Sequence, residues 1–199
     1  MCLTAECCGS GPGPATLEWG LEPGNYVLFL GRFSPDKGCH LPVQAFEQVD
    51  TGVKLLMAEA SSYCDDYSRE LRTHASDRIR MLDWVSGEAL DELITNAMIF
   101  VPPSDLEGLS LALLDAMGAG LCVLTSDVPE NREVVEETGS TFQPGNAVDI
   151  ADLLRFLIVK RAVREAAGRA AKRRIREQDQ WQKIAADIEA AYFEMLGSR

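Results

Sequence analysis

The chain has 199 residues, enough for one large domain with a substantial core. Hydrophobic residues make up 46% and charged residues 25%, which excludes a disordered or collagen-like chain. The formal net charge of -12 repels a long polyanion, so we expect no nucleic acid among the partners.

Residues 1–24 are rich in glycine and proline and show no sustained hydrophobic period, which is typical of a leader or linker. The run Gly9-Ser-Gly-Pro-Gly has some likeness to a dinucleotide-binding loop. No strand precedes it, however, and Pro12 and Pro14 interrupt any helix after it. We therefore place the folded domain at residues 25–199.

From Tyr26 onward, short apolar runs alternate with amphipathic stretches. The apolar runs predict strands at 26–30, 53–58, 78–82, 97–101, 121–125 and, more weakly, 140–142. The amphipathic stretches predict helices near 40–49, 65–75, 87–96, 109–118 and 130–137. After Pro144 the chain reads as helical, with breaks near Lys160 and Gln178. The alternation predicts an α/β fold, a doubly wound parallel sheet with a C-terminal helical extension.

Ligands of such sheets bind beyond the carboxyl ends of the strands, so the loops there are the candidates for chemistry. The loop after the first strand reads Gly-Arg-Phe-Ser-Pro-Asp-Lys-Gly and contains the cations Arg32 and Lys37. An arginine fork and a mobile lysine charge both suit phosphate oxygens. The same loop by itself could also be a solvated turn, and it contains no Walker A pattern.

The loop after the fourth strand continues into a predicted helix and contains Glu107, Gly108 and Asp115. A glycine lets the backbone approach a ligand closely, and a helix start presents N–H groups that can hold a diphosphate without a metal. If both carboxylates lie on or beside the helix, they are about 12 Å apart along its axis. One extended ligand could touch both. The alternatives are a helix-terminus carboxylate for Glu107 and a polar face residue for Asp115.

The six cysteines and two histidines lack the paired spacing of a metal site, so we expect free thiols and no bound metal. Asp65-Asp66 reads as a helix start. No apolar run approaches the roughly 18 residues of a membrane span, and no apolar segment after Met1 indicates a secretory signal. We expect a cytoplasmic protein.

Together, the two loops resemble the C-terminal domain of family 4 retaining glycosyltransferases of the GT-B class. The likeness rests on Gly31-Arg32-x4-Lys37-Gly38 and on Glu107-Gly108-Leu109-Ser110-Leu111-x3-Asp115-Ala116-Met117, and it extends over residues 24–196. The resemblance implies the Rossmann-like half of GT-B, binding a nucleoside-diphosphate sugar as donor substrate with no cofactor. The complete enzyme would transfer a hexosyl unit to a hydroxyl acceptor, without a metal and with retention.

The resemblance also implies a role for each matching residue. Arg32 and Lys37 would bind the donor diphosphate, and Glu107, in the catalytic position, would touch the donor sugar. Asp115 would bind the ribose, and the base would lie near residues 83–86. The backbone near the sugar and phosphate would be that of Gly108, Leu109, Ser110 and Leu111.

Three departures from the family pattern support an alternative, a truncated or degenerate non-catalytic module that binds a nucleotide or a partner. Asp115 replaces the usual glutamate and shortens its reach by roughly one 1.5 Å bond. Glu59 and Ala60 replace glycines, and a carboxylate there could crowd the phosphates. We expect the N-terminal acceptor domain to be absent, and neither His40 nor His74 matches its histidine.

The C-terminal helices suggest further partners. Residues 160–177 contain eight basic and two acidic residues, which suits anionic headgroups at a membrane if the acceptor is lipid-linked rather than a saccharide. A solvated face, or contact with the absent domain, is the alternative. Tyr192, Phe193 and Leu196 should expose apolar surface that fits the absent domain or drives self-association. The predicted location is cytoplasmic or peripheral to the membrane.

Overall fold

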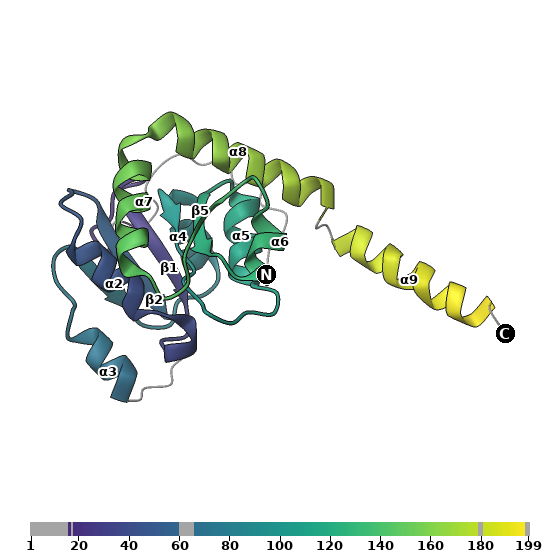
Figure 1. Cartoon of the computed structure of the whole chain (residues 1–199), viewed down its shortest axis with the longest axis horizontal. Helices are drawn as coiled ribbons and strands as arrows, with labels where there is room; N and C mark the ends of the chain where they lie inside the picture. Colours follow the sequence, from purple (N-terminus) through teal and green to yellow (C-terminus); the bar gives the residue numbers. More distant parts are fainter. Residues whose placement is uncertain (1–15, 17, 60–65, 179–180, 198–199) are drawn as a thin grey trace.

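A parallel six-stranded sheet forms the centre of the computed structural model, which describes residues 16, 18–59, 66–178 and 181–197 (Figure 1). Its order is β3-β2-β1-β4-β5-β6. Because β1 is followed outward by β2 on one side and by β4 on the other, the strand order reverses between β1 and β4. The predicted doubly wound sheet is confirmed. The strands are β1 (Tyr26–Gly31), β2 (Lys54–Glu59), β3 (Ile79–Leu82), β4 (Ile99–Phe100), β5 (Cys122–Ser126) and β6 (Ser140–Phe142).

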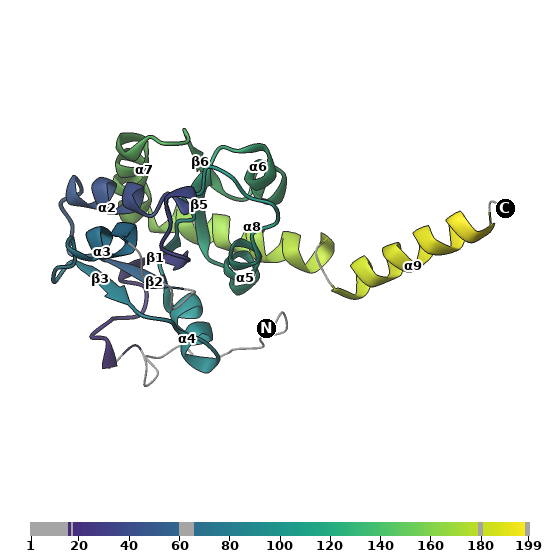
Figure 2. The same cartoon turned by 90° about the horizontal axis from the view of Figure 1, so that it is seen from below.

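Helices connect the strands and cover both faces of the sheet (Figures 1 and 2). Those within the domain are η1 (Pro35–Lys37), α2 (His40–Glu47), α3 (Asp66–Arg72), α4 (Glu88–Asn96), α5 (Leu111–Ala119) and α6 (Pro129–Val135). The C-terminal extension consists of α7 (Ala147–Val159), α8 (Arg161–Gln178) and α9 (Trp181–Gly197). The predicted breaks near Lys160 and Gln178 are therefore confirmed.

Two hydrophobic clusters lie on opposite sides of the sheet because successive strand residues point to opposite faces. In β1, Val27 and Phe29 join the cluster under α2 and α7, whereas Tyr26 and Leu28 join the one under α4, α5 and α8. Since both faces are covered, the central strands β1, β2, β4 and β5 have continuous apolar runs and not merely alternating apolar positions. This burial is why the apolar runs predicted the strands correctly.

Several element boundaries differ by one or two residues from the sequence predictions, and three of them have a clear structural consequence or cause. The second strand extends to Glu59, which pairs in register with Gly31. The fourth strand is shorter than predicted because Ala97 is the C-cap of α4. Helix α5 begins two residues later than predicted because Ser110 is its N-cap and accepts a hydrogen bond from the Leu113 N–H.

Part of the basic C-terminal segment stabilises the helices themselves. The Arg174 side chain donates to the backbone oxygens of Val134 at 2.7 Å and Glu133 at 2.8 Å, and it pairs with the Glu136 carboxylate at 2.6 Å. Arg164 likewise donates to the Ile158 oxygen at 2.6 Å, at the end of α7. These arginines satisfy carbonyls at helix C-termini, so they are not simply a solvated basic face.

Helix α9 extends away from the sheet (Figures 1 and 2). Tyr192, Phe193 and Leu196 are 62%, 67% and 70% exposed, which confirms the prediction of apolar surface there. Among the described residues, no helix is both long enough and apolar enough to cross a membrane.

Candidate functional site

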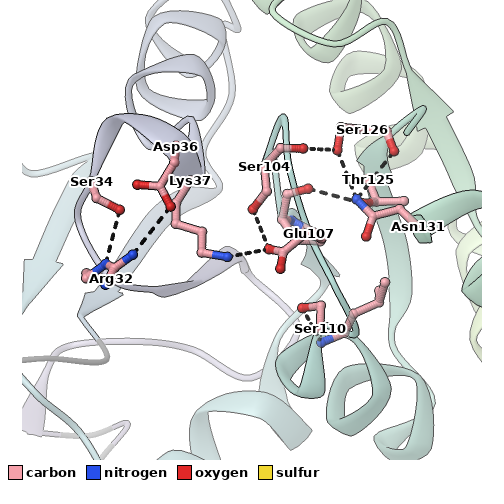
Figure 3. A network of polar contacts seen from close by, with 12 residues as sticks. Arg32, Ser34, Asp36, Lys37, Ser104, Glu107, Ser110, Thr125, Ser126 and Asn131 are labelled. Atoms are coloured by element: carbon pink, nitrogen blue, oxygen red, sulfur yellow. Dashed lines mark hydrogen bonds and ion pairs between the residues drawn. The ribbon is translucent and has the colours of Figure 1, made fainter. Parts of the chain in front are cut away.

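Two loops meet beyond the carboxyl ends of β1 and β4, where the strand order reverses. This is the place at which doubly wound sheets bind ligands. Lys37, from the loop after β1, has its Nζ 2.8 Å from Oε1 of Glu107, from the loop after β4 (Figure 3). The structure thus brings together two predicted site residues that are far apart in the sequence.

The backbones of the two loops are in direct contact. Gly38 has φ of 61°, and a Cβ on it would lie 2.5 Å from the Pro103 oxygen. A larger residue is therefore excluded both by its backbone conformation and by its neighbour. The Asp105 N–H donates to the Asp36 oxygen at 3.4 Å, and the Cys39 thiol donates to the Arg32 oxygen at 3.3 Å within the first loop.

Glu107 is well buried, with 10% of its side chain exposed against 25% for Lys37. Its Oε1 also accepts a hydrogen bond from the Ser104 hydroxyl at 2.6 Å. Glu107 lies in the loop before α5 and not on that helix. The axial spacing expected between Glu107 and Asp115 therefore does not apply, because helical rise does not determine their separation.

Arg32 is the more accessible cation, with 55% of its side chain exposed. Its Nη2 lies 3.4 Å from the Asp36 carboxylate, and its Nε donates to Ser34 at 3.3 Å. The Ser34 hydrogen bond, assisted by the charges of Arg32 and Lys37, lowers the pKa of Asp36. An exposed pair of this length contributes little energy, so an anion can compete for Arg32.

The start of α5 faces the same region. Gly108, Leu109 and Leu111 are exposed and Ser110 is half-buried. The first turn of a helix has N–H groups without intrahelical acceptors, and Ser110 satisfies only one of them. Asp115, one turn further on, is half-buried, and burial together with the nearby charge of Asp91 raises the pKa of its carboxyl.

Glu59 does not stand in a loop as expected, because it is the last residue of β2. Its carboxylate is 4% exposed and lies 2.6 Å from Nη2 of Arg72, which also lies 3.0 Å from the Asp83 carboxylate. The Arg72 guanidinium lies over the Phe33 ring at 5.4 Å. The charge that we expected to crowd the phosphates is thus buried and balanced by Arg72. Ala60 lies outside the described residues.

Sequence reasoning assigned no role to three buried polar residues at the end of β5 and on α6. The Thr125 hydroxyl donates to the Pro102 oxygen at 3.1 Å, and the Ser126 hydroxyl donates to the Ser104 oxygen. The Asn131 amide donates to the Ser126 hydroxyl at 2.9 Å. The available signal was the pair of hydroxyl residues that ends an otherwise apolar strand.

The histidines lie elsewhere. His40 Nδ1 is 2.9 Å from the Tyr67 hydroxyl, and His74 Nδ1 is 2.9 Å from the Glu47 carboxylate. Within the described part of the chain, no three His, Cys, Asp or Glu side chains are grouped so as to hold a metal ion. Cys39 and Cys122 are free thiols and are buried. The other four cysteines lie outside the described residues.

Comparison with known proteins gives a family match over most of the chain. The model of the family described as "Glycosyl transferases group 1" matches residues 18–174. Spore coat protein SA of Bacillus subtilis is 27% identical over 189 residues, which cover 88% of this chain and 50% of that protein. The chain spans about half the length of the curated relatives it matches.

Solved structures show the same fold. Sucrose-phosphate synthase from Thermosynechococcus elongatus has a TM-score of 0.81 at 25% identity, covering 95% of this chain and 50% of that one. HepE of Anabaena, solved in complex with UDP and glucose, has a TM-score of 0.82 at 20% identity and covers 92% of this chain and 51% of that one. The resemblance inferred from the two loop motifs is therefore confirmed.

Proposed function

Since the chain belongs to the group 1 glycosyl transferases, we propose that it is the donor half of a retaining hexosyltransferase. In this proposal the two loops beyond the carboxyl ends of β1 and β4 bind a nucleoside-diphosphate sugar. The complete enzyme passes the hexosyl unit to a hydroxyl acceptor. The single observation that carries the proposal is the 2.8 Å contact between Lys37 and Glu107. It joins a cation suited to phosphate and a carboxylate suited to sugar hydroxyls in one site.

The chemistry proposed for these residues follows from where charge develops. When the bond between the anomeric carbon and the phosphate oxygen breaks, the nucleoside diphosphate leaves with that electron pair. Arg32, Lys37 and the N–H groups at the start of α5 would stabilise the added negative charge. The acceptor hydroxyl forms the new bond to the anomeric carbon and gives its proton to the oxygen of the leaving diphosphate. Glu107, which can accept two donors, would hold the sugar hydroxyls.

The remaining parts of the donor would extend over neighbouring elements. Asp115 would bind the ribose, and the base would lie by the loop at residues 83–86. In this loop Trp84 is 62% exposed and offers a flat surface for a base. HepE was solved with UDP, which makes UDP the first nucleotide to test.

The proposed partners follow from the relatives' greater length. An acceptor-binding half would cover the two loops and exclude water from the reacting centre. The exposed apolar residues of α9 are candidates for contact with that half or for self-association. The acceptor would be a saccharide or a lipid-linked hydroxyl, in the cytoplasm or at the membrane surface.

Titration calorimetry with UDP tests the donor site. Replacing both cations, Arg32→Ala with Lys37→Ala, should weaken binding by on the order of 3 kcal/mol, because two charge-assisted contacts are lost. The control replaces Lys54 and Arg155 with alanine, which removes the same charge away from the two loops. Addition of EDTA should change nothing. If the Arg32/Lys37 variant and the Lys54/Arg155 variant bind UDP equally well, Arg32 and Lys37 do not bind the diphosphate.

A nucleotide-binding module without catalysis remains the second candidate, and the shortened side chain at Asp115 favours it. Release of UDP from a panel of UDP-sugars, with acceptors present, separates the two. We expect this chain alone to bind UDP near the millimolar scale, about 4 kcal/mol, and to transfer no sugar until an acceptor half from a related enzyme is supplied. Binding without turnover in that combined protein would favour the module.

A further inference from the structure

We propose that Ser126 and Asn131 are positioning residues that fix Glu107 through Ser104. With Ser104 they form a line of buried hydrogen-bonding groups, called here the hydroxyl chain, that ends at the Glu107–Lys37 pair (Figure 3). Its effect on donor recognition rests on the function proposed above. Its effect on the geometry of the pair does not.

The hydroxyl chain begins in the protein interior. Ser126, the last residue of β5, and Asn131, on α6, are 0% and 1% exposed. The Asn131 Nδ2 donates to the Ser126 Oγ at 2.9 Å, so this oxygen is used as an acceptor. The single Ser126 hydroxyl proton then points to the Ser104 carbonyl oxygen, to which it donates. Asn131 therefore determines the direction of the Ser126 hydroxyl.

Ser104 links the buried Ser126 hydroxyl to the Glu107 carboxylate. It is 2% exposed, so little water competes for its polar groups. Its carbonyl is held by Ser126, while its own hydroxyl donates to Glu107 Oε1 at 2.6 Å. The same oxygen receives the Lys37 Nζ at 2.8 Å. The position of Glu107 thus depends on a residue whose backbone is held from β5.

The loop needs such a support because β4 is short. The strand ends at Phe100, and the chain continues without helix or strand until Leu111. Buried hydroxyl and amide groups cost free energy unless they are bonded, and an apolar strand end would avoid the requirement. Placing them beside Pro102 and Ser104 makes the path of this loop specific.

Thr125 provides a matched control within the same strand. Its hydroxyl is fully buried and donates to the Pro102 oxygen at 3.1 Å, so it holds the same loop two residues before Ser104. Thr125→Val and Ser126→Ala each remove one buried hydroxyl and should both lower the melting temperature. Only Ser126→Ala breaks the path to Glu107.

Competitive acetylation of lysines, measured by mass spectrometry, tests the contact between Lys37 and Glu107 without any nucleotide, because the contact lowers the reactivity of the Lys37 amine. The rate at Lys37 is divided by the rate at Lys54, which donates to the Gly20 oxygen at 2.7 Å at the other end of the sheet. We expect this ratio to rise several-fold in Ser126→Ala, toward its value in Glu107→Gln, and to stay at the wild-type value in Thr125→Val. Partial unfolding would instead raise both rates.

A ratio in folded Ser126→Ala equal to that in Thr125→Val would overturn the proposal. If Ser126→Ala does not fold, Asn131→Ala keeps the Ser126 hydroxyl but removes its orienting donor, and the same comparison decides. A second measurement compares the dissociation constants of UDP-glucose and UDP. The dissociation constant of UDP-glucose divided by that of UDP should rise several-fold in Ser126→Ala and stay unchanged in Thr125→Val. If the wild type binds neither nucleotide, the proposed function fails while the acetylation ratio still decides the role of the hydroxyl chain.

Discussion

At the scale of single residues, the contact between Lys37 and Glu107 has a consequence for ligand affinity. A diphosphate that binds Lys37 must compete with a carboxylate already 2.8 Å from its ammonium group. Both side chains are largely buried, so solvent screens this attraction less than it screens a surface pair. Donor binding therefore replaces one charged contact by another.

We predict that Glu107→Gln tightens the binding of UDP about fivefold, roughly 1 kcal/mol, because the competing charge is removed. Calorimetry measures the change. Glu177→Gln on α8 is the control, since it removes the same formal charge from an exposed position. Weaker UDP binding in Glu107→Gln would mean that the carboxylate orients Lys37 for the ligand.

A second residue-scale prediction concerns Asp115. If Asp115 binds the ribose with a shortened side chain, Asp115→Glu should tighten UDP binding several-fold, on the order of 1 kcal/mol, by restoring the reach. A purely structural role gives the opposite result, because an added methylene in a packed helix face usually destabilises. A variant with both a lower melting temperature and a lower UDP affinity would establish the structural role. Asp152→Glu, on the exposed face of α7, controls for the substitution itself.

At the scale of elements, α8 lies so close to the end of α5 that only a glycine fits. A Cβ on Gly168 would lie 2.0 Å from the Gly120 oxygen and 2.9 Å from its carbonyl carbon. Both contacts are with backbone atoms, which cannot rotate away as a side chain can. At this position the packing of α8 on α5 therefore requires a glycine.

We predict that Gly168→Ala lowers the free energy of unfolding by about 1–3 kcal/mol, as overpacking does. Helix propensity alone would raise it by about 1 kcal/mol, so the sign of the effect identifies the cause. Urea unfolding measures it. In the control Gly52→Ala, the added Cβ has no heavy atom within 4 Å. Equal stability of the two variants would show that a Cβ at position 168 does not clash with the Gly120 backbone.

At the scale of the whole molecule, buried thiols make stability depend on alkaline pH. Burial raises the pKa of Cys122 from 9.0 to about 11 and that of Cys39 from 9.0 to about 12. Below pH 9 these thiols are protonated in both the folded and the unfolded state. Above pH 9, the two thiols lose their protons in the unfolded chain at a lower pH than they do in the folded protein. Each raised pKa therefore contributes stability that is complete below pH 9 and disappears as the pH rises through the folded value.

The predicted loss is at most about 1.4 kcal/mol per pH unit for each thiol between pH 9 and 11. Urea unfolding under reducing conditions at pH 8, 9 and 10 gives the slope. Replacing both Cys39 and Cys122 with alanine should lower stability overall but flatten its fall with pH. Stability of the wild type that rises between pH 9 and 10 would contradict the prediction.

The succession of strands and helices along the chain, and the residue types at the ends of the strands, could be predicted from the sequence alone. Burial on both faces makes the strands continuously apolar, so runs such as 26–30 and 121–125 were recognisable locally. The motifs containing Arg32, Lys37 and Glu107 were also visible, because ligand-binding loops of this fold follow particular strands. Hydrophobic periodicity did not predict helix boundaries that depend on a capping residue, such as the start of α5 after Ser110.

Which of these groups lie in contact depends on the three-dimensional arrangement of the strands and loops. The place of β1 beside β4 brings Lys37 to Glu107, and the place of β5 beside β4 brings Ser126 to Ser104. It also pairs Glu59 with Arg72, which a count of charges along the chain could not reveal. Hydrophobic periodicity reports which face of an element is buried. It contains no information on which polar groups from distant elements face one another, and their contacts depend on strand order and on the path of each loop.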